Sequence, residues 1–222
     1  MKIVDNNLDG VSVILSTTES IEKVPDNYQK LVSEPLRSAF EDPQAFIEES
    51  IVRCKISSVK KFLKTLRNHE GCDLEVHQDK NFECQLAGLR FWLNQDFGIL
   101  VAPSNGRINP HLPAPLKHLY EEFDSIHWSE YGESGGFYNC NHAPLSDIFT
   151  DFEPSDEDYD DLYVWGDCLS GHPLVWSSSN ISGWFMIHRF EVVEMGTIDD
   201  GISYIFNELA NGHEPDPYSK FC

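Results

Sequence analysis

The spacing of apolar residues changes along the 222-residue chain, and this change constrains the fold more than any other sequence feature. Two segments in the first third have the three-to-four-residue spacing of amphipathic helices. The first begins at Pro43 and has four apolar residues that we expect to face inward: Phe46, Ile47, Ile51 and Val52. The second is capped by Ser57 or Ser58 and has its own apolar face: Val59, Phe62, Leu63 and Leu66. Between residues 73 and 101 apolar and polar residues alternate, which predicts a meander of short strands.

The second half of the chain combines the same two spacings. A helix is predicted over 112–126, because apolar residues keep the helical spacing from Leu112 to Ile126. Four strand-like segments follow, most of them separated by glycine- or serine-containing turns: 162–165, 173–176, 184–187 and 190–193. Thr197 begins a final helix, which Asn211 and Gly212 end. Helices and strands do not alternate regularly, so we expect an α+β fold whose mainly antiparallel sheet is flanked by helices.

Charge divides the chain into two regions. Residues 1–109 carry 13 basic and 16 acidic side chains, whereas residues 110–222 carry 3 basic and 21 acidic ones, a net charge of −18. We expect helices and short strands at 1–109, packed on the same core as an acidic α+β region at 110–222. The densest acidic stretch, Asp151–Asp161, has seven acids and no base. Such a stretch favours a basic partner, because charge complementarity accelerates encounter, while a solvated loop without a partner is the alternative.

Composition argues against several classes of protein. A chain with a formal net charge of −21 lacks the basic surface that nucleic-acid phosphates or an anionic membrane would need. The sequence has no apolar run of transmembrane length, and its N-terminus lacks the apolar core of a signal peptide. The six cysteines are dispersed without a C-x-x-C pair. We therefore expect reduced thiols in a cytoplasmic protein.

A possible catalytic motif lies at residues 132–136, which match G-x-S-x-G. In hydrolases this motif exposes a nucleophilic serine between a buried strand and a helix. Neither neighbouring segment of Ser134 fits that requirement. We therefore expect Ser134 to lie in an ordinary turn, and a serine hydrolase is kept as an alternative.

Two groups of residues have some features of metal sites. One could supply the thiolates and imidazoles of a tetrahedral zinc site, although its spacing is not that of a zinc finger: Cys140, His142, Cys168 and His172. The other begins as a calcium loop at Asp156, Asp158 and Asp160. That loop lacks the glycine at its sixth position and the glutamate at its twelfth, where Asp161 and Asp167 stand. We expect no metal and no cofactor, with a metal-dependent enzyme as the alternative.

Three segments of the second half resemble the SUKH superfamily, which includes regulators of yeast cell-wall synthesis and many bacterial immunity proteins. Residues 112–123, LPAPLKHLYEEF, resemble its opening helix. Residues 173–187 are similar to its central strands, and residues 196–212 are similar to its closing helix. The chain departs from the family at 124–128, where the N-G-G motif is not clear, and in having residues 1–109 in front. The resemblance implies an α+β domain that acts by binding and has no catalytic residues.

For function, the resemblance implies an immunity protein that neutralises a cognate toxin. The charge independently favours a basic, nuclease-type toxin, because nucleases present basic clefts. From charge and aromatic content we predict a protein-binding surface made of these residues: Asp156, Glu157, Asp158, Tyr159, Asp160, Asp161 and Tyr163. An adaptor that binds another basic protein is a further alternative.

Overall fold

A computed structural model describes most of the chain, namely residues 2–6, 10–16, 19–78, 85–94, 97–130, 133–138, 161–168, 172–179, 183–188 and 191–216. Within these ranges, 11 strands form one sheet in which each strand pairs with the next along the chain. All these pairs are antiparallel. The fold is α+β with an antiparallel sheet, which confirms the predicted class.

The strands alternate in direction through the whole meander. They are β1 (Lys2–Asn6), β2 (Gly10–Ser16), β3 (Gly71–Gln78), β4 (Gln85–Trp92), β5 (Gly98–Pro103), β6 (Phe123–Glu130), β7 (Glu133–Tyr138), β8 (Leu162–Cys168), β9 (His172–Ser177), β10 (Gly183–His188) and β11 (Glu191–Thr197). The strands predicted between 73 and 101 and the four predicted between 162 and 193 are all confirmed.

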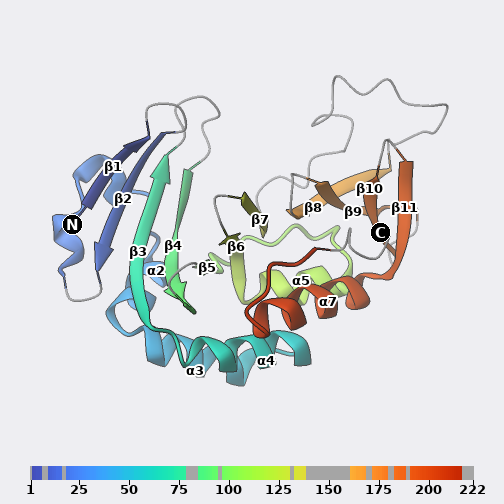
Figure 1. Ribbon diagram of the computed structural model, residues 1–222, viewed down its shortest axis with the longest axis horizontal. Helices are drawn as coiled ribbons and strands as arrows, with labels where there is room; N and C mark the ends of the chain where they lie inside the picture. The colour runs from blue at the N-terminus through green and yellow to red at the C-terminus, as the bar shows by residue number, and fades with distance from the viewer. Residues whose placement is uncertain are drawn as a thin grey trace.

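The helices of the described residues lie at three places along the chain: two between strands of the meander and one after its last strand. Between β2 and β3 lie a 3₁₀ turn, η1 (Ile21–Lys23), and four helices: α1 (Asp26–Gln29), α2 (Glu34–Glu41), α3 (Pro43–Arg53) and α4 (Ser57–Leu66). Helix α5 (Ala114–Tyr120) lies between β5 and β6, and α7 (Ile198–Ala210) follows β11. Figure 1 shows α3, α4, α5 and α7 together along one side of the sheet. In the described residues, no helix combines the length and apolarity needed to cross a bilayer.

The core lies between these helices and one face of the sheet. The predicted apolar face of α4 is fully buried: Val59, Phe62, Leu63 and Leu66 are each 0% exposed. Phe62 packs edge-on against Phe206 of α7, with ring centroids 5.3 Å apart. Phe206 also lies 5.8 Å from Phe137 of β7, so the two helices and the sheet meet at this aromatic cluster.

The sheet and the core both continue across the charge boundary near residue 109. Strand β5 pairs with β6, with Ile99 opposite Trp128 and Val101 opposite Ile126. The buried core cluster extends from Leu15 in β2 to α7. Both charge regions therefore contribute strands to one sheet, and the division of the chain at residue 109 into two regions on the same core stays a prediction.

Local sequence signals set several helix ends. Asp42 caps α3, where its carboxylate accepts a hydrogen bond from the Ala45 N–H at 2.8 Å. Thr197 and Asp200 form the predicted reciprocal capping box at the start of α7. Gly212 follows α7 with φ of 77°, a conformation that glycine adopts without strain. The predicted start and end of the last helix are both confirmed.

Three predictions about the helices are wrong. The helix predicted over 112–126 ends at Tyr120, because Ile126 and Trp128 pair with β5 as part of β6. Val52 of α3 is 80% exposed instead of facing inward. Helix α4 begins at Ser57, so its N-cap residue is Ile56 and neither serine occupies the capping position.

Candidate functional site

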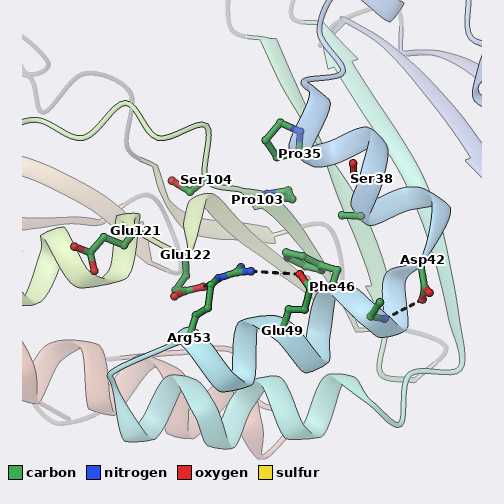
Figure 2. Close-up of a pocket in the computed structure, with 12 residues that line it drawn as sticks. Pro35, Ser38, Asp42, Phe46, Glu49, Arg53, Pro103, Ser104, Glu121 and Glu122 are labelled. Atoms are coloured by element: carbon green, nitrogen blue, oxygen red, sulfur yellow. Dashed lines mark hydrogen bonds and ion pairs between the residues drawn. The ribbon is translucent and has the colours of Figure 1, made fainter.

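A pocket of about 380 Å³ lies where α2 and α3 meet the end of β5 and the turn after α5. Figure 2 shows its lining side chains. These residues are Pro35, Ser38, Ala39, Asp42, Ala45, Phe46, Glu49, Arg53, Pro103, Ser104, Glu121 and Glu122. We call this the acidic pocket, because four of the described lining residues are acids and one, Arg53, is a base.

The local sequence explains why these elements meet. Asp42 both follows α2 and caps α3, so the two helices turn sharply around it. Glu49 and Arg53 lie one turn apart on α3 and therefore point to the same side. At the opposite wall, Ser104 donates its hydroxyl to the Tyr120 carbonyl at 2.6 Å and its N–H to the Glu122 carbonyl at 3.0 Å. These two bonds hold the turn after α5 against the end of β5.

The electrostatic centre of the acidic pocket is the ion pair between Arg53 and Glu122. The Arg53 guanidinium donates to Glu122 Oε2 from two nitrogens, at 3.2 and 3.3 Å, and to Glu49 at 3.5 Å. Figure 2 shows Arg53 between these two acids. The Glu122 side chain is 7% exposed, whereas that of Arg53 is 52% exposed. Burial raises the pKa of Glu122 in spite of the nearby guanidinium.

The pocket combines an apolar wall with an acidic rim. Ala39 and Phe46 are buried there, and Pro35 lies beside them. Glu49 and Glu121 stay largely exposed, at 71% and 42%. A lysine or arginine side chain of a partner matches this arrangement, since its methylene stem covers apolar surface while its charge meets carboxylates.

Two residues of the predicted binding surface lie in the described part of the chain. Asp161 precedes β8, and its Oδ2 accepts hydrogen bonds from the hydroxyls of Ser177 and Ser179. These bonds lower the pKa of Asp161 and close the end of the β8–β9 pair. Tyr163 is half-buried and stacks on Trp176, with ring centroids 5.0 Å apart and an angle of 23°. The other five residues, from Asp156 to Asp160, lie outside the described residues.

Ser134 lies inside β7 and not in the predicted turn, so that prediction is wrong. Its register partner is Ser129 of β6. The reason is that the glycine-rich stretch continues the meander instead of interrupting it. A nucleophile elbow needs a turn between a strand and a helix, and a position inside an antiparallel strand does not provide one.

The predicted metal ligands are only partly described. Cys140 and His142 lie outside the described residues, while Cys168 and His172 are register partners in β8 and β9. Of the calcium-loop residues, Asp167 lies in β8. Within the described ranges, no three His, Cys, Asp or Glu residues are grouped closely enough to hold a metal ion.

Sequence reasoning missed a titratable pair on either side of Gly136. His127 of β6 and Asp167 of β8 are both register partners of this glycine. Burial lowers the pKa of His127 to about 4, assisted by the charge of Arg90, and burial raises the pKa of Asp167 to about 6. Gly136 leaves room for the imidazole, because a Cβ there would lie 2.6 Å from His127 Nδ1. In the sequence, only the adjacent glycines Gly135 and Gly136 indicated that a neighbouring side chain comes this close to the strand.

No family model, curated protein or solved structure matches the chain. The resemblance to the SUKH superfamily therefore stays a prediction.

Proposed function

We propose that this chain is a non-catalytic protein-binding module, an immunity protein that neutralises a basic toxin domain of nuclease type. The observation that carries the proposal is the distribution of charge. Residues 110–222 have a net charge of −18, and the described part of this region contributes Glu121 and Glu122 to the acidic pocket. A nuclease must present cations to nucleic-acid phosphates, and an acidic protein can occupy those cations instead.

Within this proposal, the acidic pocket receives one cationic side chain of the toxin. Glu49 and Glu121 supply charge at the rim, where it steers association more than it holds the complex. Glu122 is committed to Arg53 and preserves the shape of the pocket. The acids of 156–161 supply additional long-range attraction, as predicted from the sequence.

The proposal predicts a toxin domain encoded beside this gene, and the test uses that domain and the full chain. Glu49→Gln together with Glu121→Gln should slow association several-fold at low salt and flatten its dependence on salt. The matched control is Glu22→Gln together with Glu70→Gln, which removes the same charge from exposed residues outside the pocket. Wild-type protein should also abolish the toxin's activity when mixed with it. Failure of the wild-type protein to bind or inhibit that domain would overturn the proposed function.

An adaptor for another basic protein is the second candidate, and the same pocket supports it. An adaptor would show the same fall in association rate for the Glu49→Gln, Glu121→Gln variant, but with a basic protein other than the toxin. The two candidates separate on whether wild-type protein protects cells that express the toxin domain.

A further inference from the structure

A second pocket, of about 470 Å³, lies between the first turns of α4 and α7 and the helix α5. Its polar lining residues are Lys55, Ser57, Ser58, His118, Asp199 and Ser203. It shares no lining residue with the acidic pocket. Its volume is in the range of small-molecule sites.

The first turn of α4 brings backbone donors to this pocket. The first N–H groups of a helix have no carbonyl partner within the helix, and they carry the positive end of its dipole. In the described structure, the N-cap residue Ile56 provides no side-chain hydrogen bond to these groups. By contrast, Thr197 and Asp200 close the N-terminus of α7 with a capping box. The donors of α4 are therefore the ones left for a ligand.

Ser58 gives an independent indication of a ligand at the same place. The residue is 9% exposed and lines the pocket. Its hydroxyl oxygen is buried and has no hydrogen-bond partner among the described residues. Buried polar groups of native proteins are nearly always paired, so an orphan hydroxyl beside uncapped backbone donors suggests a missing acceptor.

Charged groups around the pocket define what that acceptor can be. Lys55 Nζ lies 2.9 Å from Glu121 and 3.5 Å from His118 Nδ1, so the ammonium sits at the pocket wall in a half-exposed cluster. An oxyanion at the start of α4 would meet N–H groups, a hydroxyl and this ammonium together. Asp199 lies in the first turn of α7, where it lines the pocket. Its carboxylate repels an anion placed beside it, but it can accept a hydrogen bond from a hydroxyl or amine.

The geometry points to a binding site for a phosphate-bearing small polar molecule, with the phosphate on the N-terminus of α4. The Ser57 and Ser58 backbone N–H groups and the Ser58 hydroxyl donate to the phosphate, and Lys55 balances its charge. Asp199 and Ser203 face the polar remainder of the ligand. Lys55 of this site contacts Glu121 of the acidic pocket, but phosphate binding here needs no protein partner, so the inference does not rest on the proposed function.

The probe is inorganic phosphate, titrated into the ¹⁵N-labelled full chain at constant ionic strength with chloride. We expect saturable chemical-shift changes at the amides of Ser57, Ser58 and Val59, together with a rise in melting temperature. The Ser58→Ala variant should bind phosphate about tenfold more weakly, the effect of losing one hydrogen bond to a charged group. Without phosphate its melting temperature should equal or exceed that of the wild type, because the hydroxyl it loses has no partner.

Two further variants make the result decisive. Lys55→Gln should weaken phosphate binding as well, whereas Lys64→Gln, which removes the charge of an exposed lysine of α4 outside both pockets, should leave it unchanged. Phosphate that causes no saturable shifts at the start of α4 would overturn the proposal. Unaltered phosphate affinity in Ser58→Ala would overturn it equally, even if the protein bound phosphate elsewhere.

Discussion

Replacing Asp167 by Asn should stabilise the protein at neutral pH and change how its stability depends on pH. Burial raises the pKa of this carboxyl from 3.8 to about 6, although backbone N–H groups, including that of Gly136, partly offset the effect. The native state therefore holds the proton more tightly than the unfolded state. The contribution of the protonated Asp167 carboxyl to stability is complete below pH 4 and is lost as pH rises to about 6. The two pKa values differ by an amount equivalent to about 3 kcal/mol.

The amide of Asn cannot ionise, so Asp167→Asn should raise the free energy of unfolding at pH 7 by up to about 3 kcal/mol. His127 acts in the opposite direction, because burial lowers its pKa from 6.5 to about 4 and the unfolded state then binds the proton more tightly. Its contribution is complete above pH 6.5 and is lost as pH falls toward 4. In the wild type the two slopes oppose each other between pH 4 and 6.

The assay is urea denaturation of the wild type and of Asp167→Asn at several pH values from 4 to 7.5. The variant should lose the opposing slope of Asp167, so its stability should increase with pH more steeply than that of the wild type between pH 4 and 6 and level off above pH 6.5. A parallel His127→Gln variant should show the reverse slope, with stability that decreases from pH 4 to 6. If Asp167→Asn has the same pH profile as the wild type, Asp167 is not a buried carboxyl of raised pKa.

Three other substitutions test the packing and the ends of the elements. Gly136→Ala should destabilise the fold by about 1–3 kcal/mol in a denaturant titration, because the added Cβ would lie 2.6 Å from two atoms of β6. In the control, Gly71→Ala, the nearest atom to the added Cβ is 3.8 Å away, and the effect should be small. Arg53→Ala leaves the Glu122 carboxylate buried without its cation, which should lower the free energy of unfolding by about 1–3 kcal/mol at pH 7. The loss should be smaller at pH 4, because burial raises the pKa of Glu122 and favours its neutral form. Equal losses at both pH values would contradict this. Thr197→Ala removes the cap of α7 and should lower stability by about 1 kcal/mol, whereas Thr197→Ser should retain most of it.

Much of the fold could be predicted from apolar spacing. The buried face of α4, the strands of both halves and the capped start of α7 follow from local patterns that the tertiary structure keeps. The segment 112–126 shows where this fails. Phe123 and Ile126 fit a helix by their spacing, but pairing with β5 makes the segment a strand, and such pairing is not encoded locally.

Less of the candidate site could be predicted. Charge composition indicated the acidic half, but the acidic pocket joins α2 and α3 to a turn that follows α5 much later in the chain. Arg53 and Glu122 are 69 residues apart, and nothing in the sequence pairs them. Ser58 was predicted, as one of two candidates with Ser57, to cap its helix, and its unpartnered hydroxyl follows from the packing of α4, which the sequence does not show.

The acidic half of the chain, in the proposed function, captures a basic partner. The test measures association with the toxin domain that the proposal predicts beside this gene, across a range of salt concentrations. It uses the wild type and a variant with four acids neutralised: Asp156→Asn, Glu157→Gln, Asp158→Asn and Asp160→Asn. Asp161 is kept, because its carboxylate closes the β8–β9 pair. The control neutralises four exposed acids of the first region: Glu22, Asp26, Glu41 and Glu70.

Electrostatic steering raises association rates by about 10–1,000-fold at low salt, and added salt screens it. We expect a steep fall of the wild-type association rate with salt, a lower rate with a flatter salt dependence in the 156–160 variant, and wild-type behaviour in the control. Equal rates and equal salt slopes in all three proteins would contradict it.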